Sequence, residues 1–242
     1  MSRWTPYLGA LCGVALGAGA VAWWQGDAET AGRQRTEAIV HGYLLDHPEV
    51  IAEATQRLQD RDTGRQVAAS RPAIETPVGS AWAGNPRGDV SVIEYFDYNC
   101  GFCRASLPTV RQLIAAEPGV RIVYRDLPVL AQSSLVAARA SLLAARQGRF
   151  ARFHDALYAA GPVSDATIAA AERIAGVDTG KAAADQPAED AQLRANLDVA
   201  RRLGMAGTPS WVIGDRVLIG AQTLDQLRAA VAAARAARGT AA

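Results

Sequence analysis

Hydrophobic and polar positions follow two periods along the chain, and each change of period marks a new segment. A mostly apolar run at residues 90–96 predicts a strand, and a helical pattern follows over residues 101–116. A second apolar run at residues 120–125 predicts another strand, which completes a β-α-β unit. From there the period is helical throughout residues 130–203. The pattern therefore places a helical block directly after a β-α-β unit.

The period changes back to that of strands near the C-terminus. Residues 209–213 and 216–219 are short apolar runs separated by the turn pair Gly214-Asp215, which predicts a β-hairpin. An amphipathic helix is expected over residues 223–238. The order β-α-β, helical block, β-β-α predicts an α/β fold with one mixed sheet, in which residues 130–203 are an insertion.

The N-terminal segment, residues 1–26, contains an uncharged apolar run over residues 7–24 that follows Arg3. A basic start, an apolar centre and small residues at Ala20-Val21-Ala22 are typical of a signal peptide. A run of 18 residues is also marginally long enough for a membrane anchor, which needs about 20. With either a signal peptide or an anchor, the remainder of the chain is exported. We therefore expect a periplasmic protein that is either soluble or tethered to the inner membrane by residues 7–24.

Residues 27–68 form a second segment, which is predicted to be helical. It carries a narrow apolar stripe with a new helix start near Pro48. A lone helix with so little apolar surface is marginal in water. We therefore expect this segment to dock either on the main domain or on a second copy of itself. The two prolines in residues 70–77 favour a linker before the main domain, residues 69–242.

Composition excludes several classes of function. The 242 residues carry 25 Lys and Arg against 24 Asp and Glu, so the net charge of +1 gives no reason to expect nucleic-acid binding. There are three cysteines, of which Cys12 lies in the N-terminal apolar run. Only Cys100 and Cys103 remain for the folded part, too few for a disulfide-rich scaffold.

Cys100-Gly101-Phe102-Cys103 is a C-x-x-C motif placed where the first strand meets its helix. A zinc site would need further ligands at suitable spacing, which His41, His47 and His154 do not provide. A structural disulfide across two intervening residues would constrain little of the chain. The motif therefore predicts a redox pair, for which the oxidising periplasm is a natural compartment.

The position of the motif gives its two cysteines different roles. Cys100 is expected at the N-terminus of the helix, where free N–H groups and the helix dipole favour a thiolate. The thiolate is the attacking species in thiol–disulfide exchange. Cys103 lies one turn further along the helix, so we expect it to be more buried and to resolve the mixed disulfide on Cys100. No cofactor beyond this redox-active pair is expected.

Residues 96–103, Phe-Asp-Tyr-Asn-Cys-Gly-Phe-Cys, together with Gly207-Thr208-Pro209, resemble the DsbA-like periplasmic thiol–disulfide oxidoreductases. The resemblance implies a thioredoxin-like fold with an inserted helical domain. It implies a cis-proline loop at Thr208-Pro209 that faces the sulfurs and leaves backbone free to pair with a substrate. It also places Glu94 where related proteins hold a buried acid for proton transfer, although an ordinary polar strand residue is the alternative. Pro108 and His154 are expected to have structural roles.

Residues 43–51 are similar to the oligomerisation segment of the ScsC-type relatives. This similarity implies a homo-oligomer, such as a trimer, formed through residues 30–66. The expected substrates are unfolded or misoxidised exported proteins, and the expected redox partner is a DsbD-like or DsbB-like membrane protein. Thr208 and the uncharged dipeptide between the cysteines favour an isomerase or reductase. A dithiol oxidase is one alternative, and Cu(I) binding by Cys100 and Cys103 in copper resistance is another.

Overall fold

The protein is described by a computed structural model that covers residues 32–239, apart from the side chain of Gln56. The apolar run at residues 7–24 lies outside this range, so its expected role as signal or anchor stays a prediction. Within residues 32–239 no helix has both the length and the hydropathy needed to cross a membrane. The chain divides into two compact units, with the boundary between Leu58 and Gln59.

The first unit is helical in the part that the structure describes. One helix covers residues 32–46, and α2 (Glu49–Glu75) starts after His47 and Pro48, close to the predicted helix start. Its large apolar side chains are mostly exposed to solvent: Ile39, Val40, Tyr43, Leu45, Ile51 and Leu58. This unit therefore has little core of its own, as the narrow stripe predicted.

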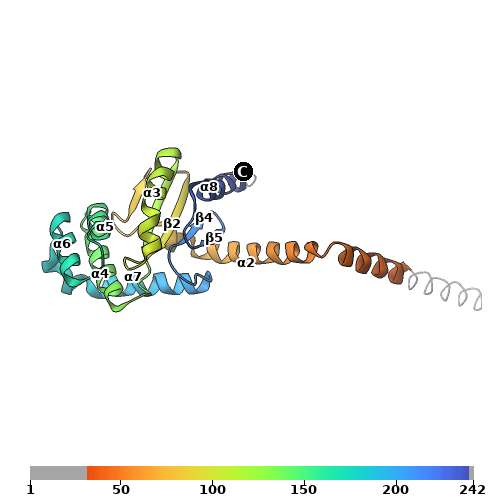
Figure 1. The fold of residues 1–242 in the computed structure, drawn as a ribbon, viewed down its shortest axis with the longest axis horizontal. Helices are drawn as coiled ribbons and strands as arrows, with labels where there is room; N and C mark the ends of the chain where they lie inside the picture. Colours follow the sequence, from red (N-terminus) through yellow and green to blue (C-terminus); the bar gives the residue numbers. More distant parts are fainter. Residues whose placement is uncertain (1–31, 240–242) are drawn as a thin grey trace, which may run out of the picture. The chain divides into compact units, whose positions relative to one another are not determined.

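The second unit is built around a five-stranded mixed sheet in the order β1-β3-β2-β4-β5 (Figure 1). Its strands are β1 (Trp82–Gly84), β2 (Val90–Phe96), β3 (Val120–Asp126), β4 (Ser210–Ile213) and β5 (Arg216–Ile219). Strands β2 and β3 are parallel, and the other pairs are antiparallel. The short edge strand β1 was not predicted, because its three residues carry no periodic signal next to the turn that follows.

Helices cover both faces of the sheet, and the alternation of side chains along β2 assigns residues to the two faces. Val92 and Phe96 belong to the larger core, together with buried residues of α3 (Gly101–Ala116) and α8 (Leu224–Gly239). Ile93 and Tyr95 belong to a second core with the C-terminal part of α2 and with α7 (Ala182–Arg202). All seven residues of β2 are buried, as expected for a central strand covered on both faces.

The predicted insertion is helical, as expected. It comprises α4 (Gln132–Arg146), α5 (Phe150–Ala159), α6 (Asp165–Ala175), a short 3-10 turn (Thr179–Lys181) and α7. Ser164 caps α6 through a reciprocal capping box with Thr167. The mixed sheet with helical insertion confirms the predicted thioredoxin-like α/β fold.

The predicted linker at residues 70–77 is wrong for most of its length, because α2 continues to Glu75 despite Pro72. Tertiary contacts override the proline signal here. Val67 and Ile74 are fully buried on the second face of the sheet. Arg125 of β3 donates hydrogen bonds to the backbone carbonyls at the end of the helix: Ala73, Ile74 and Thr76.

Candidate active site

The C-x-x-C motif begins at the turn between β2 and α3. Cys100 occupies the N-cap position of α3, and its backbone N–H donates to the carbonyl of Asp97 at 2.9 Å. No side chain caps this helix N-terminus, so its free N–H groups surround the Cys100 end of the helix. The predicted position of Cys100 therefore matches the structure.

Cys103 lies one turn further along α3 and is more buried, with an exposed fraction of 1% against 6% for Cys100. Both thiols are free, so the structure represents the dithiol form. Burial raises the pKa of the Cys103 thiol, and the nearby Glu94 carboxylate adds to this effect. Cys103 is thus a protonated and more deeply buried thiol, whereas Cys100 lies at the helix N-terminus and is slightly more accessible.

The loop before β4 closes the site from the opposite side. The Thr208–Pro209 peptide bond is cis, and the Cys100 Sγ–H donates to the carbonyl oxygen of Thr208 at 3.1 Å. The Thr208 hydroxyl oxygen is buried, and no partner for it lies in the part of the chain that the structure describes. Residues that are 108 positions apart in sequence thus meet at the first cysteine.

Glu94 lies on β2, on the same face of the sheet as Val92 and Phe96, and therefore on the side of α3. Its exposed fraction is 3%, and burial raises the pKa of its carboxyl group to about 8. When ionised, Glu94 raises the pKa of the Cys103 thiol, so the two groups interact electrostatically. The structure therefore brings Glu94, Cys100, Cys103, Thr208 and Pro209 into one region.

Asp97 is a site residue that the sequence analysis missed. Its buried carboxylate accepts hydrogen bonds from the backbone N–H groups of Asn99, Val129 and Leu130 at 2.9, 2.9 and 3.1 Å. An aspartate two residues before a turn residue commonly makes such bonds, so the Asp-Tyr-Asn run before Cys100 was a usable signal. The bonds to residues 129 and 130 could not be predicted, because they join distant segments.

His154 belongs to a buried aromatic cluster under the site rather than to the redox pair. Its Nδ1 lies 3.1 Å from the Tyr98 hydroxyl, and its ring stacks on Phe150. Burial lowers the pKa of His154 to about 3, so the ring is neutral at physiological pH. The structural role predicted for His154 fits this environment.

The surface around Cys100 is apolar and exposed. Phe102 has an exposed fraction of 69%, and Val129 and Leu130 in the neighbouring loop have fractions of 47% and 54%. Among residues 32–239 there is no group of three or more His, Cys, Asp or Glu side chains that could hold a metal ion. The arrangement can therefore attack a disulfide, or hold a soft ion through two sulfurs alone.

The fold and the cysteine pair define the class of protein, which is the thioredoxin-like oxidoreductases. A family model described as "DSBA-like thioredoxin domain" matches residues 91–232, more than half of the chain, so the protein belongs to the DsbA-like thioredoxin domain family. A second model, "Copper resistance protein ScsC N-terminal domain", matches residues 33–63. The resemblances to these two groups are thus confirmed.

Solved structures agree with this assignment. A thioredoxin-like oxidoreductase from Silicibacter pomeroyi is 40% identical, with a TM-score of 0.61, and the match covers 64% of this chain and 91% of that one. A linker-deletion mutant of Proteus mirabilis ScsC is 25% identical, with a TM-score of 0.66 and coverages of 84% and 95%. The Wolbachia pipientis thiol-disulfide exchange protein alpha-DsbA2 is 26% identical, with a TM-score of 0.65 and coverages of 72% and 96%.

Two curated relatives are much longer proteins. They are the Na(+)/H(+) antiporters NhaA 1 of Salinispora arenicola and NhaA 3 of Salinispora tropica, each 31% identical over 150 residues. The match covers 60% of this chain, and the chain spans about a quarter (23%) of either antiporter.

Proposed function

We propose that this protein exchanges disulfides in exported polypeptides, with Cys100 as the attacking thiol and Cys103 as the resolving thiol. One observation carries the proposal. The Cys100 thiol stands at the N-terminus of α3 and contacts the Thr208 carbonyl, while Cys103 is buried one turn behind it. This arrangement leaves the Cys100 sulfur nearer the surface than the Cys103 sulfur, which suits Cys100 to attack and Cys103 to resolve.

The chemistry follows from these positions. The Cys100 thiolate attacks one sulfur of a substrate disulfide, which forms a mixed disulfide and releases the other substrate sulfur as a thiolate. Cys103 then loses its proton and attacks the Cys100 sulfur, which releases the second substrate thiolate. The substrate has gained two electrons, and the protein now holds a Cys100–Cys103 disulfide. A membrane reductant must return it to the dithiol form.

Glu94 is suited to accept the Cys103 proton during this second step. Burial keeps Cys103 protonated, so its attack needs a base nearby. The Glu94 carboxyl has a pKa of about 8 and lies on the α3 side of β2, so it can take up and release a proton near neutral pH. We therefore propose that Glu94 is the proton acceptor for Cys103.

We favour the isomerase or reductase direction, in which the dithiol form acts first. Gly101 and Phe102 add no charge beside the Cys100 sulfur. The match to the ScsC N-terminal domain supports an oligomer formed through residues 30–66, such as a trimer, which would place several cysteine pairs around one substrate. In isomerisation, the released substrate thiolate attacks another substrate disulfide, and the new thiolate formed there attacks the substrate sulfur of the mixed disulfide. This releases Cys100 as a thiolate, with no net oxidation or reduction.

Reactivation of a protein with scrambled disulfides tests this direction. We expect the reduced full-length chain to reactivate it, and Cys100→Ala to be inactive. Cys103→Ser should retain part of this activity, because isomerisation needs only the attacking thiol. Activity no higher than that of Cys100→Ala would overturn the isomerase proposal.

The oxidase alternative has a distinct outcome. An oxidase would hold Cys100 and Cys103 as a disulfide in growing cells, when trapped with an alkylating reagent. It would introduce disulfides into a reduced substrate only if both cysteines were present. A mostly dithiol state in the same trapping experiment supports the isomerase or reductase direction, with a DsbD-like rather than a DsbB-like membrane partner.

Cu(I) binding is the second candidate function. Cys100 and Cys103 are both free thiols one helical turn apart, and thiolates suit this soft ion. The match to a copper-resistance N-terminal domain supports the idea. Anaerobic titration of the reduced protein with Cu(I) is expected to show tight binding that Cys103→Ser abolishes, and equal binding by that variant would contradict it.

We place this activity in the periplasm. The apolar run at residues 7–24 supports export, with the protein either free or tethered to the inner membrane. A structurally similar thioredoxin-like protein from Salmonella enterica serovar Typhimurium is described as periplasmic. The substrates would then be unfolded or misoxidised exported proteins.

A further inference from the structure

A cavity of about 240 Å³ lies between helices α4, α6 and α7 of the helical insertion. Helices α6 and α7 both pack against α4. One part of the cavity wall is apolar, and its larger side chains are Val136, Leu143 and Ile168. The charged lining residues are Arg139, Asp165, Glu172 and Glu189. Three of these four side chains are carboxylates, so the lining favours a positively charged ligand.

Glu189 of α7 is buried in this lining without a partner. Its exposed fraction is 2%, and its Oε1 atom has no hydrogen-bond donor within residues 32–239. In the same range, neither Glu189 nor Glu172 of α6 forms an ion pair. A buried carboxylate that lacks both a donor and a counter-charge is unfavourable. Such a group on a cavity wall marks a place where a ligand can supply both.

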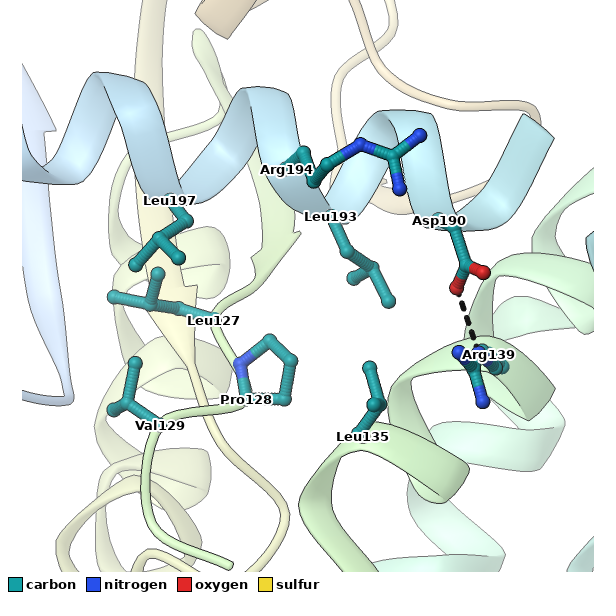
Figure 2. Close-up of a pocket in the computed structure, with 9 residues that line it drawn as sticks. All are labelled: Leu127, Pro128, Val129, Leu135, Arg139, Asp190, Leu193, Arg194 and Leu197. Atoms are coloured by element: carbon teal, nitrogen blue, oxygen red, sulfur yellow. Dashed lines mark hydrogen bonds and ion pairs between the residues drawn. The ribbon is translucent and has the colours of Figure 1, made fainter. Parts of the chain in front are cut away.

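Arg139, the cation in the lining, is already paired. Figure 2 shows its side chain directed from α4 toward Asp190 of α7, and its Nε donates to the Asp190 Oδ1 at 2.7 Å. Burial, and after it the charge of Asp185, raises the pKa of Glu189 to about 7, although Arg146 and Arg139 oppose this shift. The two arginines of α4 therefore do not compensate the burial of Glu189.

Glu172 places a second carboxyl group in the same cavity from a different helix. Burial raises its pKa as well. Because the two glutamates belong to α6 and α7, a ligand with a positive charge at each end can contact both. A metal ion is less suited, since no three His, Cys, Asp or Glu side chains within residues 32–239 are grouped to hold one, and hard cations need more oxygen ligands than two.

We propose that this cavity binds a short aliphatic diamine, with one ammonium group at Glu189 and the other at Glu172. Each ammonium carries three donors, so it can satisfy the unpaired carboxylate oxygen and balance its charge. The methylene chain between them would lie against Val136 and Leu143, where its removal from water is favourable. This binding goes beyond the proposed disulfide exchange and needs neither cysteine.

Titration calorimetry of the full-length protein with putrescine, a four-carbon diamine, tests the site. Butanediol has the same length but carries no charge, and butylamine carries one ammonium group. We expect one molecule of putrescine to bind per chain at pH 8, and butanediol not to bind. Butylamine should bind about ten-fold more weakly, because it leaves one carboxylate without a charge-assisted hydrogen bond.

Glu189→Gln keeps the shape of the side chain but removes its charge, so it should weaken putrescine binding by about ten-fold or more. Glu172→Gln should have a similar effect. Asp198→Asn is the matched control, because Asp198 lies on the same helix as Glu189, outside the cavity lining, with a side chain that is 60% exposed. It loses the same charge and should bind like wild type. Thermal unfolding without ligand verifies that each variant is folded.

The affinity for putrescine should also depend on pH. It should rise by about ten-fold from pH 6 to pH 8, because Glu189 ionises through its pKa of about 7 while the amine groups stay charged. The ionised form of the carboxyl binds the cation, so the direction of the change is fixed. Glu189→Gln should remove most of this rise, whereas Asp198→Asn should retain it.

Several outcomes would overturn this proposal. Equal binding of butanediol would show that charge plays no part, and equal binding of butylamine would remove the contact at Glu172. A loss in Asp198→Asn as large as that in Glu189→Gln would assign the binding to diffuse surface charge. A folded wild type that binds no putrescine would overturn the site itself, and the proposed disulfide exchange would be unaffected.

Discussion

Three residues at the site differ in burial and charge, and these differences separate their chemical roles. Cys100 stands at the helix end, Cys103 is protected behind it, and Glu94 lies on the adjacent strand. Burial disfavours the charged form of both inner groups, so it raises the pKa of the Cys103 thiol and of the Glu94 carboxyl. Glu94 can therefore accept the Cys103 proton only after its own carboxyl has released a proton, which a pKa of about 8 allows near neutral pH.

The raised pKa of Glu94 makes the stability of the reduced protein dependent on pH. In the folded protein the carboxyl stays protonated up to about pH 8, whereas in the unfolded chain it ionises near 4.5. The free energy of unfolding should therefore fall as pH rises from 4.5 to 8, because the unfolded state releases the proton first. The Glu94 contribution to this fall is on the order of 5 kcal/mol.

Urea unfolding of reduced wild type and Glu94→Gln at pH 5 and pH 8 measures this contribution. The variant cannot titrate, so it should gain stability relative to wild type as pH rises. Other titrating groups are common to both proteins and cancel in the difference. If the free energies of unfolding of wild type and Glu94→Gln differ by the same amount at both pH values, Glu94 does not have a raised pKa.

At the scale of elements, a buried arginine of β3 binds the end of α2. Arg125 has an exposed fraction of 2% and donates to the carbonyls of Ala73, Ile74 and Thr76. The last carbonyls of a helix have no partner within the helix, so a side chain that binds two of them and the carbonyl just beyond stabilises its end. This contact fixes the C-terminal part of α2 to β3.

Arg125→Met should lower the free energy of unfolding by about 3 kcal/mol, because it leaves buried carbonyl groups without donors. Amide hydrogen exchange should accelerate in the last turns of α2 before it does so in β2. Arg121→Met is the matched control, since Arg121 also lies on β3 and donates to the Glu75 carbonyl but is only half-buried. If both substitutions lower the free energy of unfolding equally, the burial of Arg125 gives it no greater part than Arg121 in holding the end of α2.

At the scale of the whole molecule, the first unit presents apolar side chains to water without covering them. Ile39 and Tyr43 lie one turn apart on the same helix face, with exposed fractions of 62% and 54%. A second copy of the same helix would cover them, as the proposed oligomer through residues 30–66 requires. Oligomerisation would therefore join several catalytic units through their N-terminal segments.

Ile39→Glu is expected to convert the oligomer to a monomer, as measured by sedimentation equilibrium, because like charges would meet in the helix interface. The reaction with a small disulfide should not change, since the catalytic unit is intact. Reactivation of a scrambled protein should fall. Glu37→Gln, at an exposed position on the same helix, is the control and should remain oligomeric. A monomeric wild type would contradict the oligomer.

The sequence alone predicted most of the elements and the identity of the reactive pair. Strand β2, helix α3 and the β4-β5 hairpin carry strong local signals, because apolar periodicity and turn residues act over a few positions. The C-x-x-C motif at a strand–helix junction identified its chemistry in the same local way. Edge strand β1 and the end of α2 were missed, since tertiary contacts rather than local patterns determine them.

Only the tertiary structure decided how distant residues meet around that pair. The contact of Cys100 with Thr208 depends on sheet order, which places β4 beside β2. Similarly, Asp97 reaches Val129 because two parallel strands end at one edge. Local sequence determines which residues form a strand or turn, whereas long-range packing determines which of these ends become neighbours, and here that packing builds the site.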